Sequence, residues 1–141
     1  MINFILPTRI PLRVGSKAYP IQLNPYRNWN HFLSNKLKQM YTEHLRGVLT
    51  NLPKLEPPIR IEYTLTTKDN RGRDLGNMCY IVDKFFCDAL VHYGLIEDDN
   101  YFIIPRINFI FKGLDKSIQE SYQIEVTIYD KNDRQFNGQP S

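Results

Sequence analysis

Long apolar runs, cysteines and a strong charge of one sign are all scarce in this chain of 141 residues. No segment approaches the roughly 20 consecutive apolar residues of a membrane-spanning helix, and the N-terminal MINFILPTRIPLR lacks the apolar region of a signal peptide. The formal net charge is only +3, so the whole chain has no basic field of the kind that marks a nucleic-acid-binding protein. We therefore expect a soluble, cytoplasmic protein, in which any nucleic-acid site is a local patch.

The two cysteines, Cys79 and Cys87, are eight residues apart in a segment with helical periodicity. Because an α-helix rises about 1.5 Å per residue, they would lie about 12 Å apart, which is too far for a disulfide. We interpret them as reduced, buried or half-buried thiols, as suits a cytoplasmic protein. The three histidines, His31, His44 and His92, are dispersed and show no metal-binding spacing.

Hydrophobic residues make up 42% of the chain and charged residues 23%, which are ordinary values for one soluble globular domain of this length. Apolar residues that recur at steps of three and four predict helices, and alternation of apolar and polar residues predicts strands. The order strand–helix–strand–helix–strand–strand predicts one α+β domain with two main helices and a mixed or antiparallel sheet. The predicted strands are 2–6, 59–67, 101–111 and 122–129, the helices are 26–50 and 75–93, the domain is 1–131, and a flexible tail is 132–141.

The segment 71–99, RGRDLGNMCYIVDKFFCDALVHYGLIEDD, places five aspartates and three cations around one amphipathic helix. Carboxylates gathered near cations suit a site that holds a divalent metal ion against a phosphodiester. At about 100° per residue, Asn77, Lys84 and Asp88 share one stripe of the helix, while Asp83 lies on another side. The charged residues of the segment are Arg71, Arg73, Asp74, Asp83, Lys84, Asp88, Glu97, Asp98 and Asp99.

Each of these features, taken singly, is better explained as local structure, and only their joint order favours a functional site. The structural explanations are a helix N-cap at Asp74 or Asn77, a surface ion pair of Lys84 with Asp88, a turn at 98–100 and a solvated loop at 71–73.

The chain contains several features in a fixed order. They are a strand, a basic loop, the motif R-D-L-x-N, an amphipathic helix with K-x-x-x-D-A-L, a glycine and a D-D pair. This order resembles the RusA-type Holliday-junction resolvases, which are small, often phage-derived endonucleases. The likeness in order spans nearly all of 2–130, and its specific motifs lie in 71–100. It implies a RusA-like fold, a homodimer, and Mg²⁺-dependent (or Mn²⁺-dependent) cleavage of four-way DNA junctions in recombination and repair, in a bacterial or phage-infected cell.

The resemblance also implies roles for single residues. The first aspartate of the family motif D-L-D-N falls on Asp74 and its asparagine on Asn77, whereas the middle aspartate is replaced by Gly76. The chain between Asn77 and the D-A-L aspartate is four residues longer than in the family, and this added region introduces Asp83. The family's D-D pair falls on Asp98 and Asp99, and its helix lysine on Lys84.

If the resemblance holds, Asp74 and Asp99 hold the metal, with Asp83 or Asp98 as supplementary ligands. Lys84 stabilises the transition state or orients the nucleophile. The phosphate backbone is then held by Lys68, Arg71, Arg73, Asn77 and Lys84. Two alternatives stay open: a catalytically weakened or inactive DNA-binding or partner-blocking protein, and an interaction protein whose acidic cluster is solvated surface.

Overall fold

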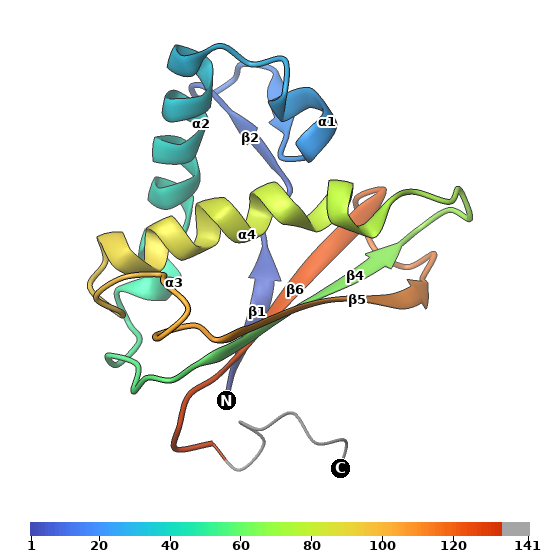
Figure 1. Ribbon diagram of the computed structural model, residues 1–141. Helices are drawn as coiled ribbons and strands as arrows, with labels where there is room; N and C mark the ends of the chain where they lie inside the picture. Colours follow the sequence, from blue (N-terminus) through green and yellow to red (C-terminus); the bar gives the residue numbers. More distant parts are fainter. Residues whose placement is uncertain (134–141) are drawn as a thin grey trace.

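Four strands form the central sheet of the computed structural model, which describes residues 1–133 (Figure 1). The strands are β1 (Ile2–Leu6), β4 (Arg60–Thr67), β5 (Arg106–Leu114) and β6 (Tyr122–Tyr129), in the order β1-β6-β4-β5. β6 is antiparallel to both β1 and β4, whereas β4 and β5 are parallel. Parallel neighbours need a long crossover, and helix α4 (Leu75–His92) provides it across one face of the sheet. The predicted single α+β domain with a mixed sheet is confirmed.

The predicted helix 26–50 contains α2 (His31–His44) and α3 (Arg46–Leu49), while a separate short helix, α1 (Leu23–Tyr26), precedes them and ends where the prediction begins. Helix α2 begins at His31 because Asn30 is an N-cap: its side-chain oxygen accepts a hydrogen bond of 2.8 Å from the backbone N–H of Leu33. The segment ahead of these helices forms a small hairpin of β2 (Arg9–Pro11) and β3 (Ala18–Pro20). The periodicity therefore predicts helix in this segment, but it does not predict that the main helix begins only at the Asn30 cap.

The other predicted elements agree closely with the structure, apart from one strand. The strand predicted over 101–111 begins only at Arg106, because Asn100 organises a turn by accepting hydrogen bonds from the backbone N–H groups of Phe102 and Ile103. The predicted tail, 132–141, lies from residue 134 onward outside the described residues. None of the helices within residues 1–133 has the length and apolarity needed to span a membrane.

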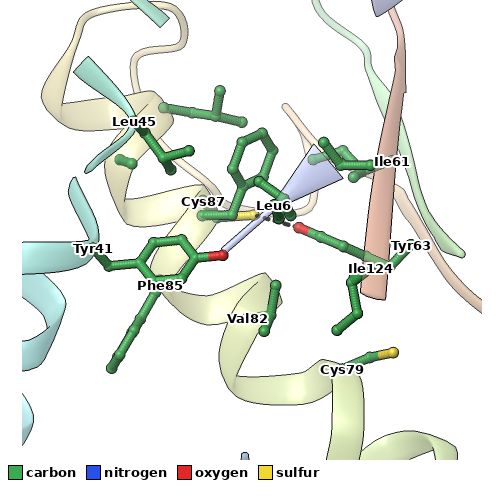
Figure 2. Close-up of a cluster of buried hydrophobic side chains, with 14 of the residues drawn as sticks. Leu6, Tyr41, Leu45, Ile61, Tyr63, Cys79, Val82, Phe85, Cys87 and Ile124 are labelled. Atoms are coloured by element: carbon green, nitrogen blue, oxygen red, sulfur yellow. Dashed lines mark hydrogen bonds between the residues drawn. The ribbon is translucent and has the colours of Figure 1, made fainter. Parts of the chain in front are cut away.

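The core lies between α4 and the sheet, and α2 closes its side (Figure 2). The apolar stripe of α4 is buried, including Val82 and Phe85, and the Phe85 ring meets that of Tyr41 from α2 edge-on at 5.8 Å. Cys79 and Cys87 are free thiols buried in this layer, as the sequence predicted. Since this stripe fixes the rotation of α4 against the sheet, it also decides where each polar residue of the helix lies.

Candidate functional site

Asp74 begins α4 as its N-cap. Its backbone is extended, and its Oδ1 accepts a hydrogen bond of 2.9 Å from the backbone N–H of Gly76. A Cβ at position 76 would lie 3.4 Å from that same oxygen, so an aspartate there would stand beside Asp74. The structural explanation of Asp74 is thus confirmed, and Gly76 marks the place where a second carboxylate would have joined it.

Asn77 anchors the first turn of α4 to the chain ahead of it. Its Oδ1 accepts a hydrogen bond of 2.8 Å from the backbone N–H of Asn24, and its Nδ2 donates to Gln22 Oε1 at 3.4 Å. The amide is therefore already engaged within the protein, and its predicted contact with DNA stays a prediction.

Asp83 points toward the sheet and is partly buried. Its Oδ1 accepts hydrogen bonds from the Tyr63 hydroxyl at 2.6 Å and from the Cys87 thiol at 3.3 Å. Burial raises the pKa of Asp83, the two hydrogen bonds oppose that shift, and the nearby charge of Asp99 adds to it. Burial, together with Asp83, also raises the pKa of the Cys79 thiol to about 12. Asp83 is therefore a carboxylate whose charge has little compensation inside the protein.

Asp99 follows the end of α4 and lies close enough to the helix for the charge of an acidic residue there to shift its pKa. The pKa of Asp99 is raised by burial first, and then by the charge of Asp88. Asp98 has a structural part, because it accepts hydrogen bonds from the backbone N–H of Asp99 at 2.8 Å and from Asn100 Nδ2 at 3.0 Å. These bonds lower the pKa of Asp98. The turn predicted at 98–100 is confirmed, and it presents Asp99 to the helix.

The carboxylates that act on one another are those near the middle and end of α4. Asp83 is nine residues beyond Asp74, which is about 13 Å along a helix axis. Among residues 1–133, no three His, Cys, Asp or Glu side chains are close enough together to hold one metal ion. The charge of Asp88 thus raises the pKa of Asp99, and the charge of Asp99 raises the pKa of Asp83. The predicted partnership of Asp74 with Asp99 stays a prediction.

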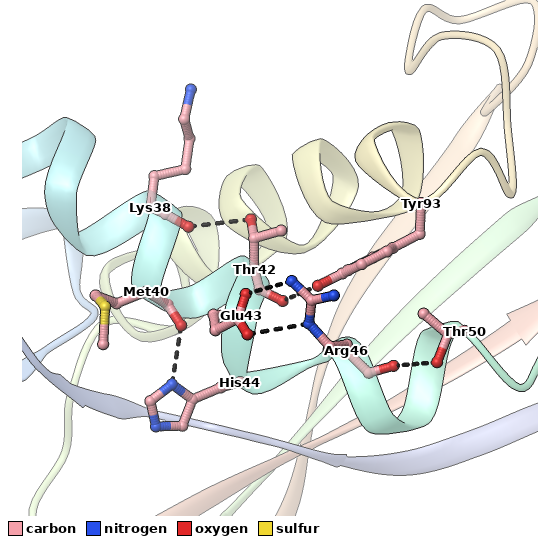
Figure 3. Close-up of polar contacts among 8 residues, drawn as sticks. All are labelled: Lys38, Met40, Thr42, Glu43, His44, Arg46, Thr50 and Tyr93. Atoms are coloured by element: carbon pink, nitrogen blue, oxygen red, sulfur yellow. Dashed lines mark hydrogen bonds and ion pairs between the residues drawn. The ribbon is translucent and has the colours of Figure 1, made fainter. Parts of the chain in front are cut away.

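A cleft of about 600 Å³ separates α2 from the C-terminal half of α4. Asp88, Asp98 and Asp99 line its acidic side, and Lys38 lies 3.7 Å from Asp88 Oδ2. Figure 3 shows the opposite wall, where the Arg46 guanidinium pairs with Glu43 in a two-point contact. The predicted Lys84–Asp88 contact is thus replaced by an ion pair from another helix.

Sequence reasoning missed Lys38, Arg46 and Tyr63. Of these, only Tyr63 could have been noticed in the sequence, because a tyrosine on the buried face of a strand needs a hydrogen-bond partner for its hydroxyl. Lys38 and Arg46 stand on a periodic helix with nothing to set them apart from other exposed cations.

The basic loop before α4 is organised by Asp69. This carboxylate accepts hydrogen bonds from the backbone N–H of Arg71 and from the guanidinium groups of Arg71 and Arg73, at 3.0 to 3.3 Å. Hydrogen bonding to Arg71 and both positive charges lower the pKa of Asp69. Lys68 and Lys84 are exposed. The two arginines predicted to bind the phosphate backbone of DNA are therefore bonded to Asp69, whose negative charge offsets part of theirs. Their contact with DNA stays a prediction.

No protein-family model matches the chain, and no curated protein is significantly similar to it. The likeness to RusA-type resolvases therefore rests on the order of its motifs.

Proposed function

We propose that the protein is a divalent-metal-dependent endonuclease that cuts four-way or other branched DNA junctions as a RusA-like homodimer. The observation that carries the proposal is the pair Asp83 and Asp99. Each of these carboxylates has a raised pKa, and the charge of Asp99 contributes to the shift at Asp83. Carboxylates whose pKa is raised in this way are frequent at functional sites, because burial disfavours their charged form and a bound cation favours it.

The donors of this pair fit Mg²⁺ or Mn²⁺. Mg²⁺ prefers oxygen ligands, keeps several of its waters, and is commonly held by one or two carboxylates together with substrate phosphates. Asp83 and Asp99 would hold it, and its remaining positions would be filled by water and by phosphate oxygens. When bound, such an ion lowers the pKa of a water nucleophile and stabilises charge on the phosphate. In this arrangement the metal lies at Asp83 and Asp99 and not beside Asp74, where the carboxylate missing at Gly76 would have stood.

The remaining residues orient the carboxylate and hold the substrate. Tyr63 and Cys87 both donate to Oδ1 of Asp83, which fixes the plane of that carboxylate before any ligand arrives. Lys84 is exposed, and the resemblance gives it the role of neutralising the charge of the attacked phosphate. Lys68, Arg71 and Arg73 would bind flanking phosphates, which read the shape of DNA rather than its sequence.

The test is cleavage of a synthetic four-way junction with Mg²⁺ or Mn²⁺, beside a linear duplex of the same sequence. We expect Asp83→Asn and Asp99→Asn each to lower the cleavage rate by about 100-fold or more, as removal of a metal ligand does, and to leave metal-free junction binding intact. Asp74→Asn is the matched control, because asparagine caps a helix as well as aspartate does. Loss of cleavage in that variant would give Asp74 a direct role beyond capping.

The same assay decides between nuclease and binding protein. Gly76 favours the second candidate, an inactive DNA-binding or partner-blocking protein, since one expected ligand is absent there. Junction binding by the wild type without cleavage under both metals would establish that candidate. Equal cleavage by the wild type, Asp83→Asn and Asp99→Asn would remove both residues from the site.

A further inference from the structure

A second groove, of about 450 Å³, lies between the basic loop and the ends of β4 and β5. Its walls are largely apolar and come from Leu65, Leu75, Phe111 and Leu114. Phe111 and Leu114 are 52% and 57% exposed, which is unusual for apolar residues that lie side by side on one strand. β5 is an edge strand of the sheet, and within residues 1–133 no further strand pairs with it. The groove is thus open to a flat apolar partner.

The rim of the groove is cationic. Arg71 and Arg73 both line it and share the single carboxylate of Asp69, so two guanidinium groups face one acid. Within residues 1–133, the Nε of Arg73 is buried and has no hydrogen-bond partner. An apolar slot with such a rim complements a nucleotide, which has an apolar base face and an anionic phosphate.

The register of the sheet places this groove next to the carboxylate pair. Tyr63, whose hydroxyl bonds Asp83, stands opposite Phe109, and Leu65 stands opposite Phe111. A strand rises about 3.4 Å per residue, so the groove wall begins about 7 Å further along the strands than Tyr63. A DNA strand seated in the groove would therefore run past Asp83.

We propose that this groove binds one unpaired base of a DNA strand, stacked on Phe111, with the adjoining phosphate at Arg71. The inference rests on the proposed DNA-directed function, because branch points expose unpaired bases, but it does not require that the protein cuts DNA.

The test is binding of a 2-aminopurine-labelled DNA in EDTA, which prevents cleavage. Three probes are compared: a single strand, a duplex with a one-base bulge at the label, and a fully paired duplex. Because stacking on an aromatic side chain contributes about 1–3 kcal/mol per base, we expect Phe111→Ala to weaken binding of the bulged and single-stranded probes about tenfold. Binding of the paired duplex should stay at the wild-type level, and Phe111→Trp should retain the affinity and quench the label.

Two further variants complete the design. Ile110→Ala alters an exposed apolar residue of the same strand on the other face of the sheet, outside the groove, and should behave like the wild type. Arg71→Gln should weaken all three probes and lower the salt dependence of binding. Thermal melting of each variant checks that the edge substitutions leave the fold intact.

The proposal fails if Phe111→Ala binds the bulged probe as the wild type does, or if Ile110→Ala loses as much affinity. It also fails if Phe111→Ala dissociates a dimer without changing DNA affinity, because the groove is then a contact between subunits. Failure of the nuclease proposal looks different: the bulge preference would depend on Phe111 while no junction is cut.

Discussion

The environment of Asp83 in the fold differs from the one that its sequence position predicts. On a helical wheel Asp83 is an aspartate that points away from Lys84 and Asp88, with no partner in view. In the fold it lies against β4, where Tyr63 donates to it and burial raises its pKa. A folded state that holds such a group binds more protons than the unfolded chain between the two pKa values. The free energy of unfolding therefore falls as the pH rises through that interval.

This linkage predicts the behaviour of Asp83→Asn, in which a neutral amide can still accept the Tyr63 hydrogen bond. We expect the variant to be more stable than the wild type at pH 7, and the difference to shrink as the pH falls to about 4, where an ordinary aspartate becomes protonated. Urea unfolding across that pH range measures the effect. Millimolar Mg²⁺ should stabilise the wild type but not the variant, because a ligand stabilises only the state that binds it.

Asp98 provides a control of opposite sign. Hydrogen bonds from the backbone N–H of Asp99 and from Asn100 lower its pKa, so its contribution to stability is present above the usual aspartate pKa and is lost as the pH falls through its lowered value. Asp98→Asn should therefore not gain stability at pH 7. A stability difference for Asp83→Asn that is constant across the pH range would show that burial does not raise the pKa of Asp83.

At the scale of elements, α4 determines where the chemistry lies. Its N-terminus is set by the Asp74 cap, and its C-terminus by Gly94, which has a positive φ of 73°. Beyond the glycine, the backbone N–H of Leu95 donates to the carbonyl of Leu90 at 3.0 Å, and that of Gly94 to Val91 at 3.0 Å. These two bonds form the Schellman arrangement, which ends the helix and turns the chain toward Asp99.

We predict that Gly94→Ala lowers the free energy of unfolding by about 1 kcal/mol, because a Cβ is strained in the left-handed conformation. Chemical denaturation gives the value. Gly72→Ala is the matched control, since Gly72 is exposed and a Cβ there would meet nothing within 4 Å. Equal effects of the two substitutions would mean that the turn after α4 tolerates a side chain. If the turn positions Asp99, cleavage should fall in Gly94→Ala alone.

At the scale of the whole molecule, the sheet and α2 bring residues that are far apart in sequence against α4. Tyr63 reaches Asp83 across 20 positions, and Lys38 from α2 meets Asp88 across 50. From the end of α4 toward its start, the features met in turn are Asp99, Asp83 and then the apolar groove with Arg71 at its rim. Such a track suits a nucleic-acid strand, whose phosphates need cations and whose cut site needs a metal.

Two nicks placed symmetrically in one junction need two sites related by two-fold symmetry. We therefore expect sedimentation equilibrium to give twice the 16.7 kDa of the chain, with or without DNA. The logarithm of the junction association constant should fall linearly with that of the salt concentration, and Arg71→Gln should reduce the slope by about 1. A monomer at every concentration, even on the junction, would contradict symmetric cleavage by a dimer.

The helices and strands that depend on contacts between neighbouring residues can be predicted from the sequence. The bounds of α4 follow from a three-and-four periodicity between an N-cap aspartate and a glycine, and the strands 2–6 and 122–129 follow from alternation. The sequence also predicts an N-cap at Asp74 or Asn77 and a turn at 98–100. Asp74 is the cap, and the contacts of that cap and of the turn reach only a few residues along the chain, whereas Asn77 bonds Asn24 and Gln22 from a distant segment. The division of the segment 26–50 was missed, since the cap at Asn30 competes with a periodicity that runs past it.

Which carboxylates lie close enough to interact depends on contacts between distant segments, and these appear only in the tertiary structure. Asp83 is a half-buried carboxylate with a raised pKa because α4 packs on β4 in one rotation, which buries Asp83 and brings it to the Tyr63 hydroxyl. The ion pair of Asp88 with Lys38, the parallel pairing of β4 with β5, and the groove beside Phe111 have the same origin. Contacts between distant segments are set by how apolar faces pack together, and a pattern read along the chain specifies those faces without specifying their partners.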